Sequence, residues 1–219
     1  MCFSVEADET LGLAVGVVGV DALRHVSRPA QLPLAALPIV FAAHQLNEAF
    51  VWWGLEGTFS DTVATAAAWI YLLVAFVFPF VVPIAVALVE PEPARRRVMA
   101  GFGALGAVVS VVLIAALVRG GANATIEDLH ISYSVDVAYG RQLAVLYVLT
   151  VCGAFLASSD RRIVLVGACN LAAVTVLGWF LMSGVISLWC AWAAVISVLI
   201  AGYLRNPVPG GGALQRATA

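Results

Sequence analysis

Lysine does not occur in this 219-residue sequence, and charged residues of all kinds make up only 11% of it. Soluble domains have about a quarter of their residues charged and about half apolar. Here 63% of the residues are hydrophobic, and the mean hydropathy is +1.01. A chain this apolar has too few polar groups to cover a water-exposed surface, so we predict an integral membrane protein with the lipid bilayer as its partner. The lack of lysine also excludes retinal bound as a Schiff base, and we expect no nucleic-acid partner.

Motifs that identify a reaction are lacking as well. The sequence has no Walker loop, no dinucleotide-binding fingerprint and no G-x-S-x-G turn. Its four cysteines show neither C-x-x-C pairs nor zinc-finger spacing. The first nine residues are acidic and contain no arginine, unlike the basic start of a secretory signal peptide. We therefore expect the first apolar stretch to be retained as a helix, and the sequence leaves open whether the protein is an enzyme.

Seven stretches are candidates for crossing a bilayer, which takes about 20 apolar residues per helix. They cover residues 10–26, 31–54, 62–89, 97–118, 141–158, 162–182 and 184–205. We predict an all-α fold, a polytopic membrane bundle of about seven transmembrane helices in a single domain over residues 1–205. The remaining residues, 206–219, are rich in Gly and Pro and are predicted to be a disordered cytoplasmic tail.

Small residues and prolines give two of these spans further expected features. Gly12, Gly16 and Gly19 provide the first span with a small-residue face for close helix packing. Pro79 and Pro83 lie inside the long third span, where each removes a backbone donor, and we expect them to kink it.

The arginines predict the orientation of the bundle. Cytoplasmic loops carry an excess of basic residues. Nine of the eleven arginines fall after the first, third, fifth and seventh spans, namely Arg24, Arg28, Arg95, Arg96, Arg97, Arg161, Arg162, Arg205 and Arg216. Only Arg119 and Arg141 fall on the opposite side, together with most of the acidic residues. We therefore predict a multi-pass protein of the plasma (inner) membrane with its N-terminus outside and its C-terminus inside.

The second span contains the most informative polar residues. His44, Gln45 and Glu48 lie within one and a half turns, and His44 and Glu48 share a helical face because they are four residues apart. A carboxylate inside a membrane span is costly and marks a candidate functional site. The alternative is that Glu48 lies near the outer interface, where it hydrogen-bonds neighbouring helices while Trp52 and Trp53 anchor the span.

Four potential metal ligands are expected at the outer half of the bundle. In the predicted orientation Cys2, Glu48, His130 and Cys190 all fall there, and thiolate, imidazole and carboxylate are ligands of zinc, copper and iron. Removal of the initiator methionine would leave Cys2 with both a free amine and a thiol. Two alternatives stay open, a Cys2–Cys190 disulfide on the oxidising side and simple packing of these residues.

The polar segment 119–140, which contains His130, is the longest predicted loop. It mixes apolar and polar residues, and long loops in compact proteins are often functional. Two interpretations are open, a lid folded over the outer mouth of the bundle and an interfacial helix resting on the headgroups.

The opening tetrapeptide, Met1-Cys2-Phe3-Ser4, resembles the start of a family of small prokaryotic integral membrane proteins of unknown function. The similarity extends to Gln45-Leu46-Asn47-Glu48, the short Arg-rich loops, His130 and Trp189-Cys190. It implies the membrane-bundle fold and leaves the function open. His44 departs from that family's pattern, in which Gln or another residue is expected.

These observations lead to three functional hypotheses. The first is an outward-facing site for a metal ion or small ligand, in which His44, Gln45, Glu48 and Trp189 line the ligand position. The second is a proton-coupled transporter or channel that uses His44 and Glu48 as a relay. The third is an accessory subunit of a larger membrane complex, and a homo-oligomer is also possible. The sequence does not identify the ligand or any reaction.

Overall fold

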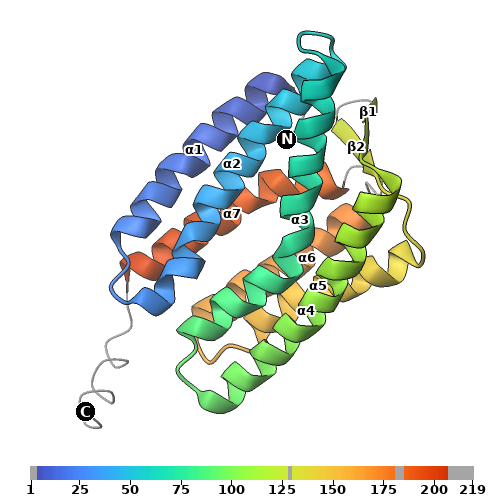
Figure 1. Ribbon diagram of the computed structural model, residues 1–219. Coiled ribbons are helices and arrows are strands. Elements are labelled where there is room, and N and C mark those ends of the chain that lie inside the picture. Colours follow the sequence, from blue (N-terminus) through green and yellow to red (C-terminus); the bar gives the residue numbers. More distant parts are fainter. Residues whose placement is uncertain (1–3, 128–129, 181–184, 207–219) are drawn as a thin grey trace.

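The computed structural model describes residues 4–127, 130–180 and 185–206, and the side chains of residues 177–191 lie outside this description. The described chain forms seven α-helices, one 3-10 turn and one β-hairpin (Figure 1). The elements are α1 (Val5–Arg24), η1 (Pro29–Gln31), α2 (Leu32–Leu55), α3 (Asp61–Val89), α4 (Pro93–Gly120), β1 (Asn123–Glu127), β2 (His130–Ser134), α5 (Gly140–Leu156), α6 (Arg161–Phe180) and α7 (Val185–Arg205). The predicted all-α bundle of seven helices is confirmed, with the hairpin as an addition.

Three of the described helices are long and apolar enough to cross a membrane. They cover Pro29–Leu55, Asp61–Val89 and Pro93–Gly120, with 27, 29 and 28 residues. Two further apolar stretches, Gly140–Leu156 and Trp192–Arg205, are shorter. The length and composition of these helices are compatible with a membrane protein.

The first helix begins five residues earlier than predicted, at Val5. Ser4 has extended backbone angles and its hydroxyl accepts a hydrogen bond from the Ala7 N–H, which is a typical N-cap. One face of α1 then packs closely on α2. A Cβ atom at Gly12 would lie 2.8 Å from the Leu46 side chain, and one at Gly19 would lie 2.6 Å from Ile39. The predicted small-residue face is therefore confirmed at these two glycines.

Two prolines shape α3 and its contacts, and the helix changes direction along its length (Figure 1). Pro79 has no N–H, so the Ala75 carbonyl lacks its helical donor. The Tyr147 hydroxyl on α5 donates to that carbonyl at 2.9 Å. Pro83 frees the carbonyl of Pro79 in the same way, and Gly106 on α4 packs directly against it. A Cβ atom at Gly106 would lie only 1.8 Å from that oxygen.

The loops that carry most of the arginines meet at one end of the bundle. Glu90, just after α3, is 2% exposed and accepts hydrogen bonds from the Ser158 hydroxyl and from the N–H and hydroxyl of Ser159. Burial raises the pKa of Glu90, but these bonds outweigh it and hold the pKa below its ordinary value. At the same end Arg205 pairs with Asp21 at 2.7 Å, which joins α7 to α1. These contacts hold the segment after α3, the segment before α6 and the ends of α1 and α7 together.

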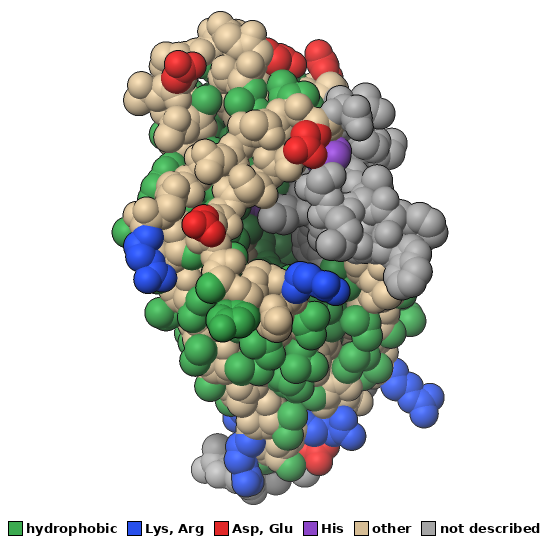
Figure 2. Space-filling model, turned by 90° about the vertical axis from the view of Figure 1, so that its right-hand side faces the viewer, with side chains coloured by type: hydrophobic (Ala, Val, Ile, Leu, Met, Phe, Trp, Pro, Cys, Tyr) green, Lys and Arg blue, Asp and Glu red, His purple; other side chains and the backbone are tan. Residues whose placement is uncertain are grey.

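Charge is unevenly distributed over the surface. In Figure 2 most of the visible Asp and Glu side chains lie in the upper half, and Arg side chains lie at mid-height and at the lower end. Hydrophobic side chains fill the surface above the lower arginines. This distribution matches the separation of charge that was read from the sequence.

The segment between α4 and α5 forms an antiparallel hairpin, so the interfacial-helix interpretation was wrong. Ala124 pairs with Tyr133 and Ile126 with Ile131. Side chains of a strand point alternately to its two faces. Ile131 and Tyr133 therefore point to the same side, where both are buried against the helices. The β-branched and aromatic residues of this segment favour strands, and the tertiary contact of Ile131 and Tyr133 fixes the register.

Candidate functional site

A buried polar cluster joins α1, α2 and the hairpin. Asp8, Gln45 and Glu48 are each at most 2% exposed. The Gln45 amide donates to the Asp8 carboxylate, which connects α2 to α1. The Tyr133 hydroxyl lies 3.4 Å from Oε1 of Glu48, which connects β2 to α2. Since isolated buried charges are costly, these contacts explain how two carboxylates are accommodated inside the bundle.

Three rings from different elements stack beside this cluster. His44 on α2 lies flat against Tyr71 on α3, with ring centroids 3.9 Å apart and planes inclined by 17°. Tyr71 stacks in turn on Tyr133 of β2, with centroids 4.3 Å apart and an inclination of 10°. Phe78 contacts the His44 ring edge-on at 6.1 Å. The stack fixes the orientation of His44 and holds the hairpin against the helices.

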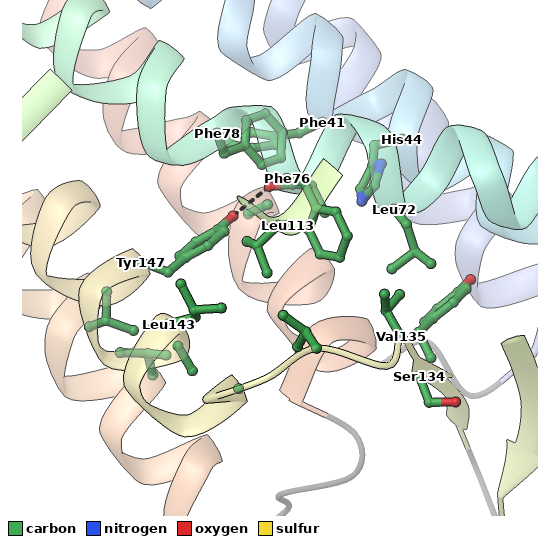
Figure 3. A pocket seen from close by; sticks show the side chains of 18 residues that line it. Phe41, His44, Leu72, Phe76, Phe78, Leu113, Ser134, Val135, Leu143 and Tyr147 are labelled. Atoms are coloured by element: carbon green, nitrogen blue, oxygen red, sulfur yellow. Dashed lines mark hydrogen bonds between the residues drawn. The ribbon is translucent and has the colours of Figure 1, made fainter. Parts of the chain in front are cut away.

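A cavity of about 450 Å³ lies next to the stack. Its wall includes side chains of α2 to α7, of β2 and of the segment before α5. Figure 3 shows Phe41, Phe76, Phe78, Leu113, Leu143 and Tyr147 around the space, with His44 directed toward it. The surface in Figure 2 has a hollow with a hydrophobic interior. Its size and apolar character are those of a small-molecule site.

His44 is the only lining residue of this cavity with an ionisable imidazole, carboxylate or guanidinium, among the residues that the structure describes. Its side chain is 6% exposed, and no described residue hydrogen-bonds its Nδ1 atom. The Tyr147 hydroxyl, also in the wall, is already bonded to the Ala75 carbonyl (Figure 3). The cavity can therefore hold an apolar molecule and offer it one imidazole.

The structure brings together three of the predicted site residues. His44, Gln45 and Glu48 are all buried on α2. His130 is also buried and begins β2, but strand alternation places it on the face opposite Tyr133, which contacts Glu48.

Cys2 and the side chains of Trp189 and Cys190 lie outside the described residues. Within the described part of the chain no three His, Cys, Asp or Glu residues are grouped as metal ligands. The predicted four-residue metal cluster therefore stays a prediction.

Three important residues were missed from the sequence, namely Asp8, Tyr71 and Tyr133. Asp8 precedes the first predicted span, which starts at residue 10, so hydropathy alone does not place it in a helix. Ser4 followed by acidic residues is a helix-start pattern that places Asp8 in the first helical turn. Nothing in the sequence pairs Tyr71 with Tyr133, which are 62 residues apart and meet only through the hairpin.

Residues 1–212 match a family whose description reads "Family of unknown function (DUF6629)". The chain belongs to that family. The expected membership of an uncharacterised family is thus confirmed. No curated protein and no solved structure matches the chain. Family membership assigns no activity, so the functional argument rests on the geometry of the cavity and of the buried cluster.

Proposed function

We propose that this protein is a multi-pass membrane protein that binds a small apolar ligand in the cavity beneath the hairpin. In this proposal all seven helices cross the plasma (inner) membrane, the N-terminus is outside and the C-terminus is inside. The ligand enters from the outer half, where the hairpin lies. The observation that carries the proposal is the apolar cavity of about 450 Å³ with His44 in its wall.

Exposed apolar side chains support membrane insertion of the remaining helices. Large patches of this kind are rare on soluble monomers and need an apolar partner. Side chains more than half exposed occur on α1, α4, α5, α6 and α7, including Val17, Val111, Val145, Val176 and Val198. Lipid contact on all of these helices accounts for them. The arginine-bearing loops that meet at one end support the proposed orientation.

The interior below the cavity favours binding over transport. The adjoining space has a volume of only about 30 Å³ and is lined mainly by apolar side chains such as Leu37, Val82 and Phe155. The core toward the arginine-rich end is likewise formed by buried apolar residues. A proton-coupled transporter using His44 and Glu48 needs a polar path through this region. Proton-driven flux in proteoliposomes that is lost in Glu48→Gln would favour that alternative.

A metal ion bound by Cys2, Glu48, His130 and Cys190 is the other form of an outward-facing site. Elemental analysis of anaerobically purified protein, beside a Cys2→Ala/Cys190→Ala variant, tests it. Stoichiometric zinc, copper or iron that disappears in the variant would support the metal form. Stable partners that co-purify in mild detergent would instead favour an accessory subunit.

The apolar-ligand proposal is tested with a pair of neighbouring substitutions on α5. Leu143 lines the cavity, whereas Val145 is 67% exposed and faces away from it. Leu143→Trp is expected to fill part of the cavity, and Val145→Trp is its matched control. Native mass spectrometry of protein released from membranes should show a bound organic molecule in the wild type and in Val145→Trp, and much less in Leu143→Trp. Equal occupancy in all three proteins would contradict the proposal.

A further inference from the structure

The polar groups of the cavity wall restrict what its ligand can carry. Among the described lining residues there is no Arg, Asp or Glu. The hydroxyls of Tyr147 and Tyr133 lie within hydrogen-bonding reach of the Ala75 carbonyl and Glu48. Transfer of an unpaired charge into such a space is prohibitively costly. A charged headgroup therefore does not fit inside the cavity.

Two polar side chains of the described wall are left for a ligand, the His44 imidazole and the Ser134 hydroxyl, and of these His44 is the one directed toward the space in Figure 3. Its ring is held by the stack on Tyr71 and by the edge contact with Phe78, so it cannot turn freely toward another partner. The side chain is more than nine-tenths buried, and Nδ1 has no hydrogen-bond partner in the described part of the chain. Because Nδ1 has almost no accessible surface, a ligand in the cavity reaches the ring at its other nitrogen, Nε2.

We infer that the cavity selects an uncharged, lipid-soluble alcohol, whose hydroxyl bonds to the His44 imidazole and whose hydrocarbon body lies among the aromatic side chains. A neutral imidazole has one N–H donor and one acceptor nitrogen. A hydroxyl can both donate and accept, so it pairs with Nε2 in either tautomer of the ring. Phe41, Phe76 and Phe78 supply the apolar surface for the rest of the molecule. This inference rests on the proposed ligand-binding function and adds the chemical class of the ligand.

The test uses three probes that share a twelve-carbon hydrocarbon chain and differ in their terminal group, namely 1-dodecanol, dodecane and dodecanoate. The full-length protein is reconstituted in nanodiscs of one phospholipid, and the bound probe is counted by mass spectrometry against empty nanodiscs. The wild type should retain dodecanol about tenfold more than dodecane, which corresponds to one buried hydrogen bond of about 1.4 kcal/mol. Dodecanoate at alkaline pH should be retained least.

His44→Phe separates the role of the imidazole from that of the cavity. Phenylalanine keeps a ring that can stack on Tyr71 but provides no hydrogen bond. The variant should retain dodecanol and dodecane equally, at the wild-type level for dodecane. Size-exclusion profile and thermal unfolding without probe establish that it is folded, and His44→Gln, which restores a donor and an acceptor, should recover part of the preference for dodecanol.

The outcomes distinguish this inference from the function on which it rests. Equal retention of dodecanol and dodecane by the wild type would overturn the alcohol specificity and leave apolar-ligand binding intact. A preference for dodecanol that survives in His44→Phe would also overturn it. Retention of no probe above the empty-nanodisc level would overturn the proposed function itself.

Discussion

The hydroxyl of Tyr147 on α5 donates a 2.9 Å hydrogen bond to the carbonyl oxygen of Ala75 on α3. That carbonyl is available because Pro79, four residues later, has no N–H. One side chain thus compensates for the proline, joins two helices and forms part of the cavity wall. The interaction links the sequence of α3 directly to the position of α5.

Tyr147→Phe is expected to destabilise the protein by about 1 kcal/mol, the size of an interhelical hydrogen bond in a membrane. Pro79→Ala restores the helical donor to the Ala75 carbonyl, so Tyr147→Phe should cost clearly less in that background. The measurement is a double-mutant cycle on unfolding by SDS in mixed micelles. An equal cost in both backgrounds would contradict the role assigned to Tyr147.

Substitution of alanine for either of two glycines of α4 is expected to have opposite effects on stability. A Cβ atom at Gly106 would lie 1.8 Å from the Pro79 carbonyl oxygen, whereas one at Gly101 meets nothing within 4 Å. Gly106→Ala should destabilise the protein by at least about 1–3 kcal/mol, because it forces α3 and α4 apart. Gly101→Ala should be neutral or stabilising by up to about 1 kcal/mol. Thermal unfolding of both variants checks this, and equal midpoints would show that α3 and α4 are not in close contact at Gly106.

Glu90 predicts a pH dependence of stability at the arginine-rich end. Its hydrogen bonds from Ser159 and Ser158 hold its pKa below the ordinary value of 4.5. The ionised group therefore stabilises the fold fully above pH 4.5, and this contribution is lost as the pH falls from there through the lowered pKa. Glu90→Gln should cost about 2 kcal/mol at neutral pH and weaken the acid-induced loss.

Glu92→Gln is the control for that experiment. Glu92 pairs with Arg95 on the surface, with its side chain 51% exposed, so its loss should change stability by less than about 1 kcal/mol. Unfolding midpoints are measured from pH 7 down to pH 3.5 in the wild type and both variants. If the wild type and Glu90→Gln lose stability in parallel, Glu90 is not responsible for the dependence.

The contacts of Tyr133 are expected to hold the hairpin against the helices. Tyr133→Phe keeps the stack on Tyr71 and removes the hydroxyl near Glu48, while Tyr133→Ala removes both. Amide hydrogen exchange over residues 123–134 should increase slightly in the first variant and strongly in the second. Ser132→Ala, a strand neighbour on the opposite face, should leave exchange unchanged. Similar exchange in all three variants would show that the ring stack does not hold the hairpin.

The helices could be predicted from the sequence because their signals are local. Apolar runs marked each helix, and Pro79 and Pro83 marked the irregular region of α3. The predicted start of α1 is five residues too late because the prediction followed hydropathy. The N-cap Ser4 starts the helix before the apolar run begins. The hairpin was not predicted, because the strand-favouring residues of its segment alternate with polar residues that are equally compatible with a loop or an interfacial helix.

The site could be predicted only in part, because its other residues come from distant segments. His44, Gln45 and Glu48 stood out as polar residues within an apolar span, which is itself unusual. Tyr71 and Tyr133 look like ordinary aromatic residues until the hairpin folds onto α3. The cavity depends on how α5 and the segment before it pack against α2 and α3, and no local pattern encodes that space.

The most direct test of the central claim is to locate a bound probe by photolabelling. A long-chain alkane bearing a diazirine is added to the protein in nanodiscs, irradiated, and mapped by peptide mass spectrometry. Ligand binding in the cavity predicts labelling of Leu143, Tyr147 and Phe76, which line it, and loss of that labelling in Leu143→Trp but not in Val145→Trp. Labels confined to exposed positions outside the cavity, such as Val145 and Leu149, and unchanged by either substitution would contradict the account.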